Sequence, residues 1–571
     1  MLRLASNRYH GRAMTGSQDS AGPRDMAPLM EQIGAFIGAR LPRWHTPGAV
    51  VGLTDRDGAL GTVACGWADL AARRAMTVAD RFQIGSIGKS FAAIIVLQEW
   101  ERGNLDLHAP VTDYVPWFTV RSRFAPITLH HLLTHTSGLI TGTDVSLDAR
   151  HELWLLRESE CTYAPGERFL YSNDGYKLLG VVLEEVTGTP FPQLLAERLL
   201  GPLAMDDSDP MITLATRATT ATPHQRMYDD RPRHAGHPLV ASPWYETASA
   251  DGSIVSTAAD MCAYARLLLD RGEGPEGRLL GDEAFRLLTG RHVEDPTEED
   301  WYGYGLGTYD EDGRTLVGHS GGMVGFSSYL MVDPDAGLGV VVLMNGNEQL
   351  KDLVKYVLEA GRAAAAGQAV PAPPPPADPT RLGAAAEEYA GVYTAPGDGQ
   401  APAPSLTLAA AGGRLLMRHQ GADIVLERVD GDVFLVPHAD LDRFALRFWR
   451  DDEGRVTQAT HGPDWYAGPA YGGPTAFPPV PDASAICGHY HCWNAWMDHL
   501  RIVERAGRLW LIAPWLDETA GELELVPLGD GSFRVGPEEW RPDRLAIDTV
   551  LDGTATRAVY DVLPFYRAAT P

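Results

Sequence analysis

Residues 82–100 restrict what this chain can fold into more than any other stretch. A serine and a lysine, Ser86 and Lys89, precede residues 91–97, a run in which every side chain is apolar. A helix that is apolar on all sides must be buried between other layers, and Gly103 is expected to end it. At helical spacing Ser86 and Lys89 share a face, with Cβ atoms about 5–6 Å apart, so the amine can reach the hydroxyl. Ser86 would lie on the first turn, where free N–H groups favour a developing anion.

Length and composition set the class of protein. With 571 residues the chain is too long for one core, and we expect two to four domains. The formal net charge of -27 argues against a nucleic-acid partner or an anionic membrane surface. Five cysteines indicate no disulfide framework. Neither an export signal nor a membrane span is expected, so we predict a cytoplasmic protein.

Strand-like segments lie at both ends of residues 26–366, around a helical middle. This order predicts one antiparallel sheet closed by distant parts of the chain, with a helical subdomain inserted: an α/β (α+β) fold. Residues 1–25 are expected to be disordered. The expected elements are a helix at 26–41, strands at 49–54 and 60–67, a helical, loop-rich part at 105–300, strands at 302–309, 315–320, 326–332 and 338–345, and a helix at 350–366.

A change of composition marks a domain boundary after this part. Residues 367–382 are rich in proline and alanine and predict a semi-rigid linker. Beyond it, short strands and turns recur in the same order at a nearly constant spacing, for instance 391–393 with 488–490. We therefore expect two small antiparallel all-β barrels, at 383–480 and 481–571.

Three separate segments carry residues suited to acyl transfer. A serine hydroxyl becomes a nucleophile when a neighbouring base takes its proton, and Lys89 can do so if burial lowers its pKa. Tyr171-Ser172-Asn173 offers a second proton carrier and an amide that can hold a substrate carbonyl. His319-Ser320-Gly321-Gly322 follows at the end of a strand, where glycines let substrate approach and the Gly322 N–H can join that of Ser86 in an oxyanion hole.

Together these motifs resemble the serine beta-lactamase and penicillin-binding-protein superfamily, in its class C-like branch of family VIII esterases and D-aminopeptidases. The resemblance covers about residues 26–366 and extends to the flanking phrases 105–107, 132–139, 165–166 and 252–260. It implies that Ser86 is acylated, that Lys89 and Tyr171 share the proton transfers, and that Asn173 and His319 contact substrate or tune the site. Which residue is the acylation base in this superfamily is disputed. Some D-aminopeptidases carry two C-terminal lipocalin-like barrels, and this layout matches theirs.

One motif departs from the beta-lactamase pattern, because His319 replaces the lysine of Lys-Thr-Gly. A permanent cation that would hold the carboxylate of a beta-lactam is thereby lost or made pH-dependent. By resemblance, histidine here is typical of the esterase and D-aminopeptidase members. The departure moves the expected substrate away from beta-lactams and toward small amides and esters.

Two histidine-containing segments raise the question of a metal. The histidines at 130, 131 and 135 lie in a phrase that recurs structurally in the resembled family. Residues 487–492 place Cys487, His489 and His491 on one face of a strand, half of a conceivable zinc site, but Cys492 would point away. We favour an opening barrel strand with aromatic packing, and expect neither a metal nor a cofactor.

The sequence thus predicts a cofactor-independent serine hydrolase with a Ser86 acyl-enzyme, acting on a small molecule or short peptide. D-aminopeptidase or amidase activity leads, carboxylesterase activity follows, and a thioesterase, transacylase or peptide cyclase is a third candidate; the same acyl-enzyme serves all of them. A catalytically silent binding protein is the alternative from another class. A homo-oligomer is compatible with the sequence.

Overall fold

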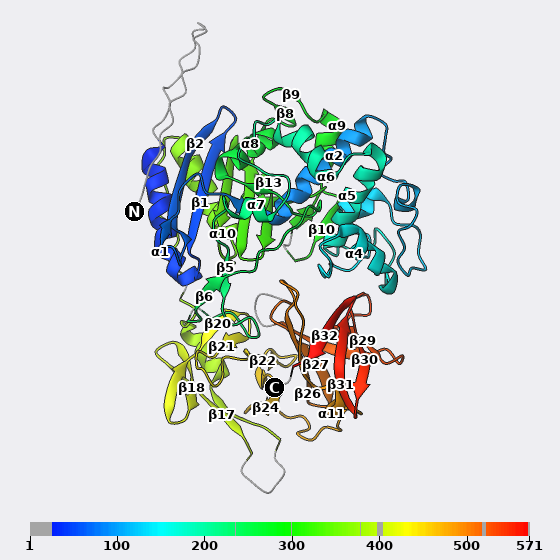
Figure 1. Cartoon of the computed structure of the whole chain (residues 1–571). Helices are drawn as coiled ribbons and strands as arrows, with labels where there is room; N and C mark the ends of the chain where they lie inside the picture. Colours follow the sequence, from blue (N-terminus) through cyan, green and yellow to red (C-terminus); the bar gives the residue numbers. More distant parts are fainter. Residues whose placement is uncertain are drawn as a thin grey trace. The chain divides into compact units, whose positions relative to one another are not determined.

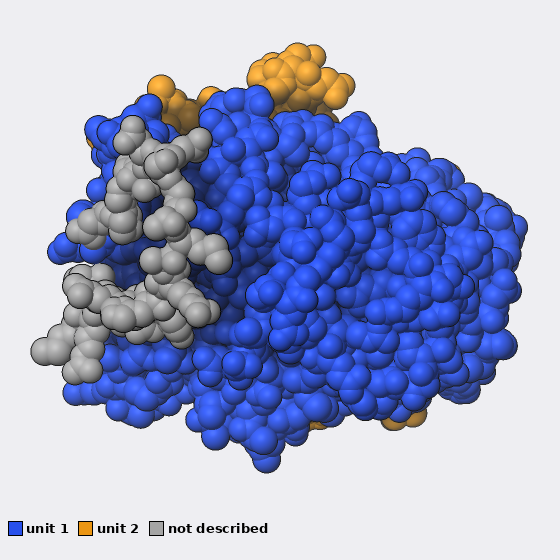
Figure 2. Space-filling view, turned by 90° about the horizontal axis from the view of Figure 1, so that it is seen from above, with its two compact units in different colours: residues 1–225, 239–375 blue, residues 226–238, 376–571 orange. Residues whose placement is uncertain are grey.

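The chain divides into two compact units, coloured separately in Figure 2. The computed structural model describes residues 26–234, 236–297, 300–376, 378–396, 403–516 and 521–568. Unit 1 comprises residues 1–225 and 239–375, and unit 2 comprises residues 226–238 and 376–571. The N-terminal segment predicted to be disordered, 1–25, lies outside the described residues.

Unit 1 is built on a nine-stranded antiparallel sheet in the order β10-β11-β12-β13-β14-β15-β1-β2-β3. Strand β15 pairs with β1 along its whole length, so the two ends of this part of the chain share one sheet, as predicted. In Figure 1 the blue strands β1 and β2 accordingly lie beside the green strands. The main strands are β1 (Gly48–Asp55), β2 (Ala59–Asp69), β12 (Gly307–Glu311), β13 (Arg314–Met323), β14 (Phe326–Asp333) and β15 (Leu338–Met344); shorter ones are β3 (Arg74–Ala75), β10 (Val293–Asp295) and β11 (Asp300–Tyr302).

The central strands are apolar at successive positions because helices cover both faces of the sheet. On one face, Val51 and Val340 share a core with α1 (Ala27–Trp44) and α10 (Lys351–Ala365). On the other face lies α8 (Ala258–Leu269), so close that a Cβ on Gly52 would be 2.7 Å from the Cys262 sulfur. The sheet is therefore the middle layer of three.

The helical subdomain lies between the two strand groups in sequence. Its central helix, α2 (Gly88–Glu101), has no exposed side chain between Phe91 and Leu97, as its all-round apolar sequence predicts. The other helices are α3 (Leu129–Leu133), α4 (Ala149–Leu155), α5 (Asn173–Thr187), α6 (Phe191–Leu195), α7 (Leu214–Arg217) and α9 (Asp282–Leu288). None of the helices in the described ranges combines the length and apolar character that a membrane span requires.

One predicted strand, residues 302–309, is two strands in the structure. Strand β11 ends at Tyr302 and β12 begins at Gly307, with Gly305 at φ +71° between them. A Cβ on Gly305 would lie 2.8 Å from the backbone of Lys89. The chain turns here because it passes over the first turn of α2, a contact that periodicity along the sequence cannot reveal.

Unit 2 contains two all-β modules and the loop 226–238, which joins the paired strands β5 (His224–Arg226) and β6 (Leu239–Ala241). The second module is a closed eight-stranded barrel. Its strands are β25 (Gly488–His491), β26 (His499–Arg505), β27 (Arg508–Ile512), β28 (Glu522–Pro527), β29 (Ser532–Val535), β30 (Arg544–Leu551), β31 (Thr554–Tyr560) and β32 (Leu563–Arg567).

The first module has nine strands because its fourth strand is broken. Strands β19 and β20 flank the buried Leu426, whose N–H bonds to the Leu415 carbonyl at 2.9 Å, so the nine strands curve almost into a closed barrel. The strands are β16 (Gly391–Thr394), β17 (Ser405–Ala411), β18 (Arg414–His419), β19 (Ala422–Val425), β20 (Glu427–Asp430), β21 (Val433–Leu435), β22 (Leu446–Arg450), β23 (Val456–His461) and β24 (Asp464–Ala467).

A shared hydrogen bond supports the internal repeat. Tyr393, in the first strand of the first module, donates its hydroxyl to the Tyr389 carbonyl at 3.0 Å. Tyr490, at the same place in the second module, donates to the Ile486 carbonyl at 2.6 Å. Each buried tyrosine thus ties the opening strand to the short helical turn that precedes it.

This repeated bond predicts a stability effect. Tyr393→Phe leaves the buried Tyr389 carbonyl without its donor, which should lower the free energy of unfolding of unit 2 by about 1–3 kcal/mol. Urea unfolding followed by tryptophan fluorescence measures it. Tyr566→Phe, at a tyrosine that is 52% exposed, is the matched control and should change the midpoint little. Equal midpoints for both variants would contradict the structural role of this bond.

Candidate active site

Ser86 lies in a 3₁₀ turn, η1 (Gly85–Ile87), that leads from β4 (Phe82–Gln83) directly into α2. Gly85 adopts φ +53°, a left-handed conformation that glycine takes without strain. Ser86 is partly exposed, whereas Lys89, one turn further on, is 0% exposed. The turn thus presents the hydroxyl while the helix holds the amine inside the protein.

The Lys89 amine contacts the Ser86 hydroxyl directly, with 2.9 Å between Nζ and Oγ. Its second partner is the Asp251 carbonyl, at 2.8 Å. Burial lowers the Lys89 pKa to about 8; the charge of Asp251 opposes this shift, and the charge of Lys177 adds to it. In its neutral form the amine can keep donating to the Asp251 carbonyl and turn its lone pair to the Ser86 hydroxyl.

Tyr171 approaches the same pair from the segment that precedes α5. Its side chain is hydrogen-bonded to Ser86, and the Lys89 Nζ lies 5.0 Å from the centre of its ring. Burial raises the Tyr171 pKa, so the phenol keeps its proton near neutral pH and can donate it to Ser86 Oγ. Asn173 is the first residue of α5, where its N–H donates to the Thr141 carbonyl at 2.7 Å.

The predicted glycines lie in β13, against the turn that carries Ser86. A Cβ on Gly321 would lie 2.0 Å from the Ile84 oxygen, and one on Gly85 would lie 2.5 Å from the Gly322 oxygen. The side chain of Ser328, opposite Gly321 in β14, donates to the Ile84 carbonyl at 2.7 Å. Only glycine permits this approach, which brings the Gly322 main chain beside the Ser86 turn.

His319 is buried and neutral at the end of a directional chain of hydrogen bonds. The Ser172 N–H donates to His135 Nδ1 at 3.0 Å, which leaves the proton of that neutral ring on Nε2, 3.2 Å from the Tyr302 hydroxyl. The Tyr302 hydroxyl then donates to His319 Nε2 at 2.9 Å, and His319 Nδ1–H donates to the Ser320 carbonyl. Burial, with a smaller contribution from Lys89, lowers the His319 pKa to about 4 despite the Ser320 bond.

His135 also braces the segment that carries Tyr171. Its carbonyl accepts the Leu170 N–H at 2.8 Å and its ring accepts the Ser172 N–H, so the backbone is held on both sides of Tyr171. The two rings lie 4.2 Å apart between centres. His135 adopts φ +56°, a left-handed conformation that is uncommon for residues other than glycine, and the surrounding hydrogen bonds maintain it.

Three residues of this site were not among the predicted site residues: His135, Tyr302 and the Asp251 carbonyl. His135 stands in the phrase 132–139 that helped to carry the family resemblance, so that phrase was the available signal. Tyr302 and Asp251 stand in no recognised motif, and only the fold brings them to Lys89 and His319.

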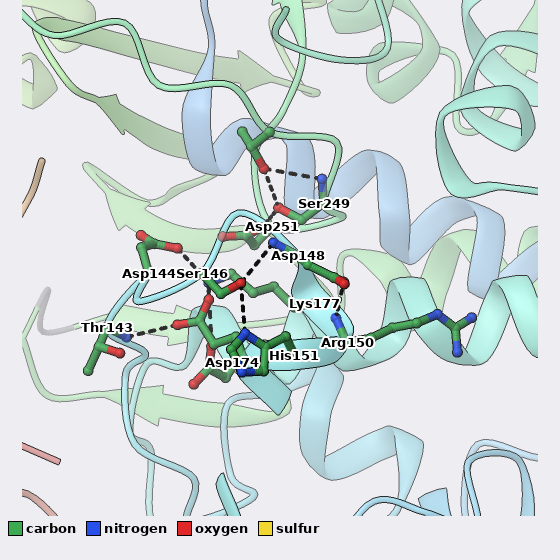
Figure 3. A network of polar contacts seen from close by, with 12 residues as sticks. Thr143, Asp144, Ser146, Asp148, Arg150, His151, Asp174, Lys177, Ser249 and Asp251 are labelled. Carbon is green, nitrogen blue, oxygen red and sulfur yellow. Dashed lines mark hydrogen bonds and ion pairs between the residues drawn. The ribbon is translucent and has the colours of Figure 1, made fainter. Parts of the chain in front are cut away.

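A second buried lysine, Lys177, is surrounded by carboxyl groups (Figure 3). Lys177 Nζ lies 2.5 Å from Asp144, 2.7 Å from Glu152 and 3.5 Å from Asp174. Although burial alone would lower it, these carboxylates raise the Lys177 pKa well above its usual value. Lys177 therefore stays charged, and its charge helps to keep the Lys89 amine readily deprotonated.

Comparisons with known proteins match the part of the chain that carries this site. A family model described as Beta-lactamase matches residues 27–363. Penicillin-binding protein 4 of Amycolatopsis lactamdurans is 31% identical over 321 residues, covering 53% of this chain and 81% of that protein. Protein flp of Staphylococcus aureus (strain MW2) is 25% identical over 344 residues, covering 57% of this chain and 65% of that protein.

A solved structure shows the same fold. The octameric penicillin-binding protein homologue from Pyrococcus abyssi matches with a TM-score of 0.54 at 23% identity. The match covers 76% of this chain and 99% of that chain.

The close approach of β13 to the Ser86 turn yields a matched pair of variants. Gly321→Ala places a methyl group against the Ile84 oxygen and should lower the melting temperature by several degrees, because backbone must move. Gly322→Ala meets nothing within 4 Å and should melt close to the wild type. Differential scanning fluorimetry of both variants measures these melting temperatures. Equal values would show that β13 can move to accommodate the added methyl group.

Proposed function

Because this chain belongs to the Beta-lactamase family, we propose that it is a serine hydrolase that forms an acyl-enzyme on Ser86. The observation that carries the proposal is the 2.9 Å contact of Ser86 with a buried amine whose pKa is lowered to about 8. A base poised near neutral pH can accept the hydroxyl proton as the oxygen attacks. Tyr171, which is hydrogen-bonded to the same Ser86 hydroxyl, supports the assignment of Ser86 as the nucleophile.

In the proposed mechanism Lys89 is the base of the first step. The neutral amine takes the Ser86 proton while Oγ bonds to the substrate carbonyl carbon, and the Ser86 and Gly322 N–H groups stabilise the resulting oxyanion. Collapse of this intermediate breaks the bond to the leaving amine or alcohol. The protonated pair of Lys89 and Tyr171 supplies the proton that the leaving group needs. Water then attacks the acyl ester, and Ser86 recovers its proton.

The surroundings of the site favour substrates that carry a positive charge on the acyl side. His319 is neutral at physiological pH, so the third motif offers no permanent cation for a substrate carboxylate. After the effect of burial, the charges of Asp251 and Asp295 raise the Tyr171 pKa further, so these two carboxylates provide negative charge near the site. A substrate ammonium group would be attracted there, as an aminopeptidase or amino-acid amidase requires.

We therefore place aminopeptidase or amidase activity first and esterase activity second. The preference for D-amino acids follows from the resemblance of the three motifs and the two-barrel layout to D-aminopeptidases. Esters without an amino group would use the same acyl-enzyme, and their better leaving groups make them useful probes.

Labelling with a fluorophosphonate probe tests the nucleophile and its base. The wild type should be labelled, with a rate that rises with pH and is half-maximal near pH 8, because only the neutral Lys89 amine can accept the proton. Lys89→Met, which keeps the volume and removes the base, should slow labelling by about 100-fold or more.

Ser86→Ala should abolish labelling, whereas the matched control Ser90→Ala, at a buried serine in the first turn of α2, should retain it. Labelling that survives Ser86→Ala would refute the acyl-enzyme. A pH-independent rate would refute the role of Lys89.

A substrate panel tests the acyl specificity. D-amino-acid p-nitroanilides should be turned over faster than their L-isomers, and N-acetylation should lower kcat/KM by about tenfold, because it removes the ammonium charge worth about 1.4 kcal/mol. His319→Lys should lower turnover of the aminoacyl substrates, since it adds a like charge beside the site. Turnover of p-nitrophenyl esters alone would overturn the preference for amides and leave an esterase.

A further inference from the structure

A cluster of potential metal ligands lies in unit 2, apart from the proposed active site. Asp229 comes from the loop 226–238, His499 is the first residue of β26 in the second barrel, and Asp498 directly precedes that strand. One ligand atom from each of these three side chains lies within 4.8 Å of the others. Segments far apart in the sequence thus bring two carboxyl groups and an imidazole to one point.

The distance between two of the ligand atoms fits a tetrahedral metal centre. Bonds of about 2.0–2.2 Å from a zinc ion to nitrogen and oxygen separate neighbouring ligand atoms by roughly 3.3 Å. His499 Nε2 lies 3.3 Å from Asp229 Oδ1. This separation is longer than most charge-assisted hydrogen bonds.

A second histidine orients the first. His489 Nε2 lies 2.8 Å from His499 Nδ1, and His489 is buried. When His499 donates from Nδ1 to His489, its Nε2 lone pair points toward Asp229. Metal-binding histidines characteristically use their other ring nitrogen in this way.

The chemistry of the three side chains indicates which ion would bind. Asp229 and Asp498 contribute carboxylate oxygens, and His499 contributes an imidazole nitrogen. Imidazole together with carboxylate is a ligand set suited to zinc-class ions, whereas calcium and magnesium prefer oxygen alone.

The loop that carries Asp229 is already held in position by ion pairs. Arg501 binds Asp230 at 2.8 Å, and Arg231 binds Asp442 of the first module at 2.9 Å. These contacts present Asp229 to the second barrel without help from a metal, so the ligands are preorganised.

We infer that Asp229, Asp498 and His499 form a binding site for a divalent transition-metal ion of the zinc class, which ties the loop 226–238 to the second barrel. This site differs from the half-site at Cys487, His489 and His491 considered from the sequence. Only His489 is common to both, and here it orients a ligand. The proposal is independent of the hydrolase activity.

Metal binding to the full-length chain tests the inference. After treatment with a chelator and its removal, the wild type is dialysed against zinc sulfate, and bound zinc is counted by mass spectrometry. Asp229→Asn and His499→Gln should each bind one equivalent less than the wild type. Cobalt(II) should give visible absorption in the wild type that both variants lose. Zinc should also slow tryptic cleavage after Arg233 in the wild type but not in these two variants.

The control is the other histidine–carboxylate group, His419, His438 and Asp440 of the first module. His438→Gln should keep the cobalt absorption and the protection from trypsin. The near-isosteric Asp498→Asn serves as a further ligand variant, and melting temperatures without metal show that each variant is folded.

Any of three outcomes would contradict the proposed metal site. These are no zinc bound by the wild type, an unchanged zinc count in the ligand variants, or loss of the cobalt spectrum only in His438→Gln. Equal binding of magnesium or calcium would overturn the zinc-class assignment.

Discussion

The contact between Ser86 and Lys89 inside the protein is the interaction on which the rest of unit 1 depends. An amine with no exposed surface is unfavourable as an ammonium: lowering its pKa from 10.5 to about 8 corresponds to about 3 kcal/mol. This cost arises because α2 is enclosed by apolar packing. Among the described residues, Lys89 has the Ser86 hydroxyl and the Asp251 carbonyl as its hydrogen-bond partners. Enclosing the helix in turn requires the sheet and the helical subdomain to meet over it.

Two kinds of support keep the surrounding groups in place. Close backbone packing, possible only at Gly85 and Gly321, fixes β13 against the Ser86 turn. Hydrogen bonds fix the remaining groups: His135 holds the Tyr171 segment at both sides, and Tyr302 links it to His319. His135 and His319 are both neutral, and each accepts a hydrogen bond at one ring nitrogen. The third motif consequently presents a neutral, oriented ring where a lysine would present a charge.

The two β modules of unit 2 share one strand arrangement but differ in how the sheet closes. Both modules tie their first strand to the preceding turn by a tyrosine hydroxyl, and both use eight strand positions around a core. The first module breaks its fourth strand at Leu426, whereas the second closes fully. The loop 226–238 adds charged contacts to both modules, through Asp230 and Arg231.

The sequence by itself determined the elements and the motifs, because periodicity, turn residues and the spacing of Ser86 and Lys89 are local properties. It predicted the sheet joined from two ends, the buried helix and two β modules. Only the tertiary structure decided which residues without a motif reach the site. Asp251 and Tyr302 do so because a loop and a strand end converge on α2, and Gly305 divides a predicted strand because that strand crosses α2. Likewise Asp229 meets His499 through folding alone, since no pattern along the chain relates a hairpin loop to a distant barrel strand.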